Sequence, residues 1–332
     1  MQSSRIVYFD ILKAIAIIAV IYTHCLQHLG IGGYLHHPIF KFFYAFHMPL
    51  FMTVSGYFAV TALKQPFAKM MKDKVKRLLL PCLTCGLLVI GVNYVTEMGT
   101  YSHTGLRELI SNLWYLKSLF LCFLFARVAL FVTRQTLNAV IISMAASFIF
   151  PYAYHLNFML PFFWLGYAWH GNEKWCHYHN RKIFLVSCLL FFSLWNYWDG
   201  GDTTYITPLK LYSISKLQWL GTIHLKSYLL RIGIGIVGTL LVTSFVWELK
   251  ERGILRTAIS RIGQHTLEIY ILQAILINTS VLTLFKVKYI SLLYEILYCP
   301  TIAFVIIVGC LLLLRLFRKN PLLYFLLFGK KR

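Results

Sequence analysis

Long runs of apolar residues recur along almost the whole chain, separated by short polar connections. A helix needs about 17 to 25 such residues to cross the hydrocarbon core of a bilayer. Hydrophobic residues make up 59% of the 332 residues and charged residues only 13%, whereas a soluble domain is far more charged. Because backbone groups in lipid must be satisfied within the chain, the sequence predicts an all-α, polytopic membrane helix bundle. No linker-like segment divides it, so residues 1–332 are predicted to form one membrane-embedded domain.

About ten transmembrane helices are predicted by the positions of these apolar runs. They are expected near residues 8–27, 39–62, 78–97, 113–133, 138–153, 155–170, 183–198, 228–247, 264–284 and 293–314. The fifth to seventh segments are short, and their limits depend on Pro151 and Pro161 marking turns or kinks.

The basic residues predict the orientation of the chain in the membrane. Most of the 32 Lys and Arg residues fall in connections on the same side as the N-terminus, which by the positive-inside rule is the cytoplasmic side. An even number of spans returns the C-terminus there, with residues 315–332 as a basic cytoplasmic tail. The formal net charge of +21 is spread over these connections, so it predicts the lipid bilayer and acidic ligands as partners, and not nucleic acid.

The first predicted helix carries three polar groups on one face, namely Asp10, Lys13 and His24. At about 100° per residue, His24 returns to within about 20° of Lys13, and Asp10 lies within about 60°. Ionisable groups inside a membrane helix are costly and usually face a cavity or a partner. The stripe therefore predicts a lined tunnel. The alternative is an Asp10–Lys13 pair at the interface with His24 at the outer end of the helix.

The second predicted helix places His47 at a depth comparable with that of His24. Pro49 follows closely and should kink this helix and free a backbone carbonyl. His47 is therefore interpreted either as a functional residue or as a structural histidine bonded to the disrupted backbone.

Residues 64–77, which follow, are predicted to form a loop; they are rich in Lys and Arg and end with Lys74, Lys76 and Arg77. Such a segment suits the phosphates of a cytoplasmic donor. It also suits simple anchoring to the anionic cytoplasmic leaflet, and charge alone does not separate these interpretations.

Taken together, these motifs resemble the acyltransferase 3 family of membrane O-acyltransferases. The segments that carry the resemblance are, in chain order, Asp10-Ile11-Leu12-Lys13 with His24, Phe46-His47-Met48-Pro49-Leu50-Phe51 with Ser55-Gly56-Tyr57, Lys74-Val75-Lys76-Arg77 with Pro81, Leu113-Trp114-Tyr115-Leu116, Pro161-Phe162-Phe163-Trp164-Leu165-Gly166, and Thr266-Leu267-Glu268-Ile269-Tyr270. Three positions depart from the family pattern: Lys13 and Lys74 replace the commoner Arg, and Gln273 stands where many relatives carry a histidine.

The resemblance implies an enzyme of the bacterial cytoplasmic membrane that moves an acyl group, commonly acetyl, from cytoplasmic acyl-CoA. The acceptor would be a hydroxyl of a cell-surface glycan or of its lipid-linked precursor. We predict His24 as general base, with Asp10 and His47 as further catalytic candidates. The predicted acyl-CoA-binding residues are Lys13, Lys74, Lys76 and Arg77. The predicted acceptor-side residues are Ser55, Tyr57, Trp114, Tyr115, Glu268 and Tyr270.

Other chemistries remain open at the level of sequence. An acyl-enzyme route would use Cys25 or Ser55 as nucleophile. No bound cofactor and no metal site are predicted, since the His170–His179 cluster matches no recurring zinc spacing. The alternative function is a transporter or flippase for a lipid-linked glycan or small anion, with Lys13, Lys117 and Arg231 along its pathway.

Overall fold

The computed structural model describes residues 7–30, 34, 37–96, 112–149, 154–170, 181–198, 212–213, 218–219, 225–248, 253–278, 285–287 and 293–330. Almost all of these residues are helical, which confirms the predicted all-α class. The exception is one antiparallel pair of two-residue strands, β1 (Tyr212–Ser213) and β2 (Gln218–Trp219). Most of the long connection between residues 199 and 226 lies outside the described residues.

Each of the ten predicted segments contains a helix. The helices are α1 (Val7–Leu29), α2 (Pro38–Tyr57), α3 (Ala59–Leu63), α4 (Phe67–Lys74), α5 (Leu80–Thr96), α7 (Trp114–Thr133), α8 (Thr136–Ile149), α9 (Leu156–His170), α10 (Arg181–Tyr197), α12 (Leu225–Glu248), α13 (Gly253–Gln264), α14 (Thr266–Asn278), α15 (Cys299–Phe317) and α16 (Pro321–Phe328), with π-helical turns η2 (Val75–Leu79) and η5 (Tyr294–Tyr298). Five helical segments of the described chain are long and apolar enough to cross a membrane: Val7–Leu29, Phe67–Thr96, Trp114–Thr133, Lys226–Glu248 and Tyr294–Phe317. The count of ten spans and the sides of the termini stay predictions.

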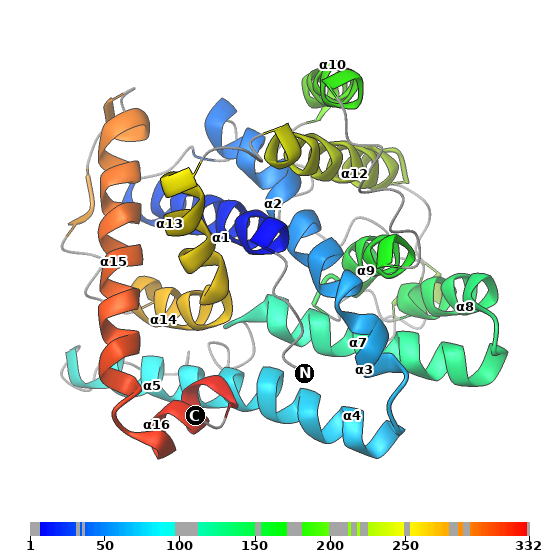
Figure 1. Cartoon of the computed structure of the whole chain (residues 1–332), viewed down its shortest axis with the longest axis horizontal. Helices are drawn as coiled ribbons and strands as arrows, with labels where there is room; N and C mark the ends of the chain where they lie inside the picture. Colours follow the sequence, from blue (N-terminus) through cyan, green and yellow to red (C-terminus); the bar gives the residue numbers. More distant parts are fainter. Residues whose placement is uncertain are drawn as a thin grey trace.

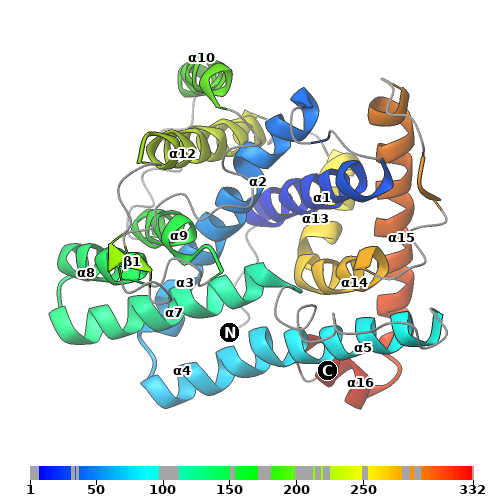
Figure 2. The ribbon, with the colours of Figure 1, turned by 180° about the vertical axis from the view of Figure 1, so that it is seen from behind.

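Helix α1 lies in the middle of the molecule (Figure 1), packed against α2, α12, α13, α14 and α15. Figure 2 shows the same arrangement from behind, with α15 nearly vertical at the right edge, beside the ends of α1 and α14. Most of the α1 side chains are buried, including Asp10. The polar stripe of α1 therefore faces neighbouring helices.

Helices α2 and α9 cross at close range, which two glycines make possible. A Cβ atom on Gly56 would lie 2.0 Å from the carbonyl oxygen of Phe163, and one on Gly166 would lie 1.8 Å from that of Thr53. Small residues let membrane helices approach at backbone distance, where dispersion contacts replace the missing hydrophobic driving force. This contact helps to hold α2, which carries His47, in place.

Two prolines produce the two π-helical turns. The backbone N–H of Leu80, just before Pro81, donates to Val75 O, and that of Cys299, just before Pro300, donates to Tyr294 O. A proline has no N–H with which to continue the α-helical ladder, and the preceding turn widens to a five-residue spacing. Both turns interrupt helices that continue on either side.

The prediction that residues 64–77 form a loop is wrong. Most of it is helical, because α4 starts after Pro66 and continues through η2 into α5. Its Lys, Met and Ala residues have high helix propensity, and Met70 is buried against the bundle. The basic residues are thus held on a helix that enters the apolar region directly.

Residues 315–332 do not form an extended tail where the structure describes them. Asn320 accepts hydrogen bonds from the N–H groups of Leu322 and Leu323 and so caps α16, which ends at Gly329 with φ +62°. A Cβ atom on Gly329 would lie 1.9 Å from Lys76 O. The apolar α16 therefore docks on the backbone of the basic turn.

An ion pair closes this C-terminal contact. Lys330 Nζ lies 3.0 Å from Glu268 Oε1, and the Tyr324 hydroxyl donates to the same oxygen at 3.4 Å. The Glu268 side chain is only 4% exposed. The Lys330 ammonium is the one cation paired with this carboxylate among the described residues.

We expect Lys330→Met to loosen the C-terminal segment, because a buried carboxylate without its cation is costly. Since Lys330 is one-third exposed, the expected effect is about a fivefold faster proteolytic cleavage between α15 and the C-terminus, equivalent to about 1 kcal/mol. Adding Glu268→Gln to that variant should restore resistance, as both charges are then absent. Equal cleavage rates in wild type and Lys330→Met would contradict the role of this pair.

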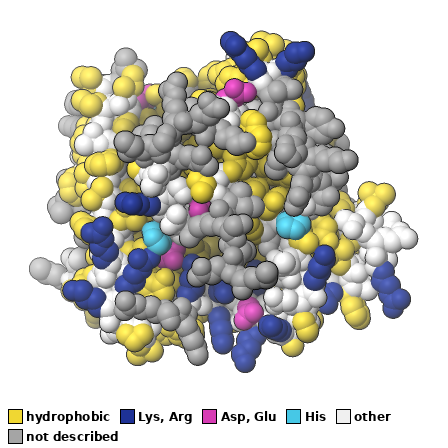
Figure 3. Space-filling view, in the orientation of Figure 1, with side chains coloured by type: hydrophobic (Ala, Val, Ile, Leu, Met, Phe, Trp, Pro, Cys, Tyr) yellow, Lys and Arg dark blue, Asp and Glu magenta, His cyan; other side chains and the backbone are white. Residues whose placement is uncertain are grey.

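The surface of the bundle is rich in exposed apolar side chains. Phe131 is 74% exposed, Leu137 72% and Leu189 71%, and many others line the outer helices. Soluble monomers rarely expose such continuous apolar area, so these faces fit contact with lipid. Lys and Arg side chains gather along the lower edge of the face in Figure 3, over the region of α4, α5 and α16 in Figure 1.

Candidate active site

Two cavities lie along the polar stripe of α1. The smaller one, which we call the lysine cavity, has a volume of about 210 Å³. It is lined by Lys13 of α1, Val54 and Ser55 of α2, Leu78 of η2, Tyr115 of α7 and Tyr270 of α14, with five further residues, all but Thr266 apolar. It is a largely apolar space with one ammonium group in its wall.

The second one, which we call the histidine cavity, has a volume of about 320 Å³, at the lower end of the range for small-molecule sites. Its polar lining residues are His24, Gln27, His28, Tyr44, His47, Asn112, Trp114, Tyr270, Gln273 and Asn278. The structure thus brings His24 and His47 to one cavity, as their predicted depths required.

Tyr270 lines both cavities. Its ring makes an edge contact with that of Tyr115, with centroids 5.9 Å apart, and the Tyr115 hydroxyl lies 2.9 Å from Ser55 Oγ. The two spaces therefore meet at a wall made by these tyrosines.

His24 has a specific partner on α14. Its Nδ1 lies 3.1 Å from Gln273 Oε1, and Gln273 Nε2 donates to Tyr270 O at 3.2 Å. The His28 ring lies one turn further along α1, with its centroid 6.1 Å from that of His24. His24 is held by a neutral amide and has no carboxylate partner among the described residues.

His47 is bonded to its own helix. Its Nδ1 lies 2.7 Å from Phe43 O, one turn earlier in α2, and its ring makes an edge contact with Tyr44. This bond supports the interpretation of a structurally held histidine. It does not remove His47 from function, because the residue also lines the histidine cavity.

Asp10 belongs to a different part of the stripe. Its Oδ1 lies 2.7 Å from Lys13 Nζ, and its side chain is only 3% exposed against 26% for Lys13. Fourteen residues separate Asp10 from His24, which is about 21 Å along a helix axis. Asp10 is therefore the partner of Lys13 and does not line either cavity.

Of the predicted donor-binding residues, Lys13 lines the lysine cavity, and Lys74, Lys76 and Arg77 do not. Lys74 turns inward, with Nζ 3.6 Å from the centroid of the Phe123 ring, a cation–π contact. Lys76 is half-buried and Arg77 is exposed. Both lie just before Leu78 in the chain, and Leu78 lines the lysine cavity.

The structure separates some of the predicted acceptor-side residues. Trp114 lines the histidine cavity, while Ser55 and Tyr115 line the lysine cavity. Tyr57 packs on Phe9 and Trp169, and Glu268 pairs with Lys330. Tyr57 and Glu268 therefore line neither the lysine cavity nor the histidine cavity.

Several residues of the histidine cavity escaped the sequence interpretation as site residues. Gln27 and His28 follow His24 by three and four residues, and this helical spacing was an available signal. Gln273 was noted only as a departure from the family pattern. Its contact with His24 joins residues 249 positions apart, and no local sequence pattern predicts such a contact.

Arg231 is a buried cation next to this site. Its Nη2 donates to Tyr44 O at 3.2 Å, and its guanidinium packs over the rings of Tyr44, Phe158 and Trp198. Among the described residues, these aromatic rings stabilise the positive charge of the guanidinium as a carboxylate would elsewhere. Arg231 fixes Tyr44, which lines the histidine cavity.

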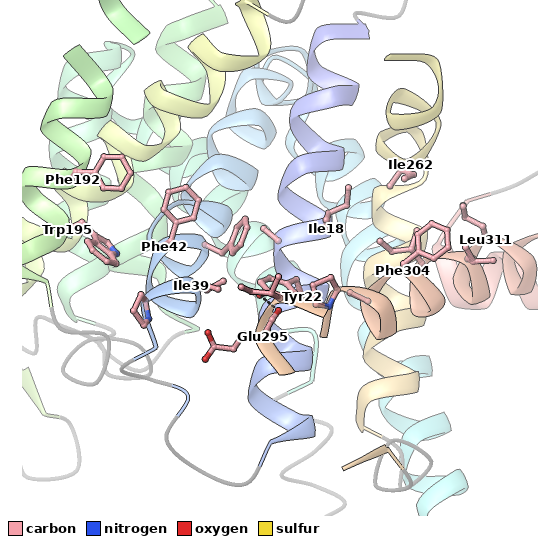
Figure 4. A pocket seen from close by; sticks show the side chains of 18 residues that line it. Ile18, Tyr22, Ile39, Phe42, Phe192, Trp195, Ile262, Glu295, Phe304 and Leu311 are labelled. Atoms are coloured by element: carbon pink, nitrogen blue, oxygen red, sulfur yellow. Dashed lines mark hydrogen bonds between the residues drawn. The ribbon is translucent and has the colours of Figure 1, made fainter. Parts of the chain in front are cut away.

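An apolar crevice of about 800 Å³ lies between α1, α2, α10, α13 and α15 and is shown in Figure 4. Its polar groups are Tyr22, whose hydroxyl donates to Glu295 O at 2.8 Å, and the Glu295 carboxylate, which contacts His37. Tyr22 and His24 lie about 160° apart on α1. The crevice is thus on the opposite side of α1 from the histidine cavity.

In the described part of the chain, no three His, Cys, Asp or Glu side chains are arranged so that they could hold a metal ion. Of the His170–His179 cluster only His170 is described. The site therefore offers histidine, amide, hydroxyl and ammonium groups for chemistry.

The chain belongs to the acyltransferase 3 family, since the model of this family's acyltransferase domain matches residues 6–328. The expected family is thereby confirmed, and with it membership in a family of acyltransferases.

Two curated relatives are called nodulation protein NolL. The protein of Sinorhizobium fredii (strain NBRC 101917 / NGR234) is 30% identical over 228 residues, covering 61% of this chain and 60% of that protein. The protein of Mesorhizobium japonicum (strain LMG 29417 / CECT 9101 / MAFF 303099) is 30% identical over 203 residues, covering 55% of this chain and 54% of that protein. The matches thus span between half and two thirds of the relatives' length. No solved structure matches the chain.

Proposed function

We propose that this protein transfers an acyl group, commonly acetyl, from cytoplasmic acyl-CoA to a hydroxyl of a cell-surface glycan or its lipid-linked precursor. The observation that carries this proposal is the pair of cavities along α1, one with Lys13 and one with His24, that meet at Tyr270. Two substrates that approach from opposite sides of a membrane need such an arrangement. Family membership supplies the reaction class.

The lysine cavity suits the donor arm. Its walls are apolar except for Lys13, Ser55, Thr266 and the tyrosine hydroxyls, which fits an alkyl-amide chain leading to a thioester. Lys76 and Arg77 lie next to its Leu78 wall and would meet the phosphates of the nucleotide. The donor would then reach toward Tyr270 while its charged end stays at the cytoplasmic face.

The histidine cavity suits the acceptor. Its lining alternates imidazole, amide and aromatic side chains, groups that hydrogen bond hydroxyls and pack on sugar rings. We assign Trp114 and Tyr44 to this packing, and His47 to orienting the acceptor or the developing oxyanion.

His24 would act as general base in a direct transfer. Its imidazole takes the proton of the acceptor hydroxyl as that oxygen bonds to the thioester carbonyl carbon. The carbon–sulfur bond then breaks, and the coenzyme A thiolate leaves with the proton returned by the imidazolium. Of the two candidate nucleophiles of an acyl-enzyme route, Cys25 is buried against Tyr294 and lines neither cavity. Ser55 lines the lysine cavity, but among the described residues its hydroxyl contacts the Tyr115 hydroxyl and no histidine or carboxylate that would activate it. We therefore favour direct transfer.

The test is release of free coenzyme A by the purified protein in lipid nanodiscs, with acetyl-CoA and a crude glycan extract. Release that requires the extract, with radiolabelled acetyl recovered in the glycan, is the expected result. A transporter or flippase would release no coenzyme A with or without the extract. Absence of release with every acyl donor and extract tried would reject the enzyme.

Lys13→Met is expected to lower kcat/KM for acetyl-CoA by at least about 30-fold, because it removes the cation of the lysine cavity and an ion-pair partner of the buried Asp10 carboxylate. Lys13→Arg keeps the charge and should stay within a few-fold of wild type in the same steady-state assay. The double variant Lys13→Met with Asp10→Asn separates the two causes. Full recovery in that variant would show that Lys13 only neutralises Asp10.

A further inference from the structure

Gln273 of α14 contacts His24, the proposed base, which lies on α1. One end of its side-chain amide donates a hydrogen bond and the other end accepts one. A backbone carbonyl only accepts hydrogen bonds, so the atom of Gln273 that faces Tyr270 O at 3.2 Å is the NH₂ group. The atom that faces His24 Nδ1 at 3.1 Å is then the carbonyl oxygen, which also only accepts. The amide orientation is therefore set by the helix to which it belongs.

This orientation determines where the proton of a neutral His24 ring resides. An accepting oxygen at Nδ1 requires a hydrogen on Nδ1, and a neutral imidazole has only one N–H. The lone pair is then on Nε2, which receives no hydrogen bond within the described part of the chain, while the ring lines the histidine cavity. A general base needs this tautomer, with its lone pair toward the substrate.

The surroundings of Gln273 leave it little freedom. Its side chain is fully buried, and it lies on α14 one turn from Tyr270, whose ring separates the two cavities. The other titratable groups near His24 are His28 on α1, His47 and Tyr44 on α2, and Tyr270 on α14. Within the described structure, none of them is hydrogen-bonded to the His24 ring, so Gln273 alone sets its tautomer there.

We propose that Gln273 is the positioning residue of the acyl transfer, holding His24 as its Nδ1–H tautomer so that Nε2 takes the acceptor proton. This inference rests on the proposed function, in which His24 is the base. Gln273 thereby fills the place that an orienting carboxylate takes beside the histidine of hydrolase triads, with a neutral amide in its stead. A neutral partner suits a site within the membrane, where another buried charge would be costly.

The test combines kinetics with a readout that is independent of turnover. Gln273→Met keeps the volume and removes both hydrogen bonds, and we expect kcat to fall about 10- to 100-fold while KM for acetyl-CoA stays within a few-fold. Gln273→Glu keeps the acceptor at Nδ1 and should recover most of that loss. In ¹⁵N-histidine-labelled protein, protonated and unprotonated ring nitrogens resonate far apart. The His24 signals, assigned by their absence in His24→Ala, should report Nδ1–H in wild type and lose that pattern in Gln273→Met.

Asn93→Leu is the matched control. It also deletes a buried amide that bonds to α14, in this case to Asn278 O at 3.1 Å. Asn93 itself lines neither cavity, although its partner Asn278 lines the histidine cavity. An equal loss of kcat in both variants would mean that only the seating of α14 matters, and would overturn the inference. So would an unchanged His24 tautomer and kcat in Gln273→Met, with the proposed function intact if His24→Ala is inactive. Full activity in His24→Ala would reject the base itself.

Discussion

Replacing His24 by alanine is expected to lower kcat for acyl transfer by about 10²- to 10⁴-fold, the contribution of a positioned general base. KM for acetyl-CoA should change little, because the Lys13 end of the stripe and the lysine cavity do not include His24. The measurement is extract-dependent release of coenzyme A by purified wild-type and variant protein. Binding of acetyl-CoA to both, measured separately, shows that the donor site is intact.

Two companion variants make the result specific. His24→Gln keeps a side chain that can hydrogen bond to Gln273, so a similar loss of kcat in this variant points to chemistry and not to packing. His28→Ala removes the neighbouring imidazole of the same cavity, 6.1 Å away, and is expected to act mainly on KM for the acceptor. If His28→Ala abolished turnover while His24→Ala retained it, His28 and not His24 would be the general base.

Gly166→Ala is expected to prevent recovery of a folded protein, a large structural effect for the addition of a single methyl group. Its Cβ would lie 1.8 Å from Thr53 O and 2.7 Å from Tyr57 N. Both atoms are backbone, so no side chain can rotate away, and α2 and α9 would have to separate. Overpacking typically costs about 1–3 kcal/mol where side chains can adjust, and a rigid backbone clash should exceed that. The measurement is the yield of monodisperse protein in detergent size-exclusion chromatography.

Gly91→Ala is the control for this effect, since a Cβ at Gly91 in α5 meets nothing within 4 Å. Alanine is favoured over glycine inside a helix by up to about 1 kcal/mol, so this variant should be recovered at least as well as wild type. Normal yield of Gly166→Ala would show that α2 and α9 are not packed as closely as described.

Much of the fold was predictable because the forces that shape it are local in the chain. The apolar runs located the helices, since a backbone without water must satisfy its own hydrogen bonds. Pro81 and Pro300 explain the π-turns that precede them, and Asn320-Pro321 with Gly329 explains the limits of α16. The connection at residues 64–77 was wrongly expected to be a loop, because its charge was weighed above its helix propensity.

The candidate site was predictable only as far as one helix carries it. The spacing of Lys13 and His24 placed both on one face of α1, and both line cavities. Tyr57 and Glu268 were grouped with the site through motif position alone. The structure places them among aromatic rings and in the Lys330 ion pair.

The all-helical class, the family and the polar stripe of α1 could be predicted from the sequence, because hydropathy, motifs and the 3.6-residue period are properties of short segments. The contact of Gln273 with His24, the ion pair of Lys330 with Glu268 and the meeting of two cavities at Tyr270 join distant segments and required the folded structure. In a membrane bundle the lipid-facing and buried sides of a helix are both apolar. Hydropathy therefore locates helices without saying which faces meet, and that choice rests on close backbone contacts such as Gly56 and Gly166 and on a few buried polar pairs.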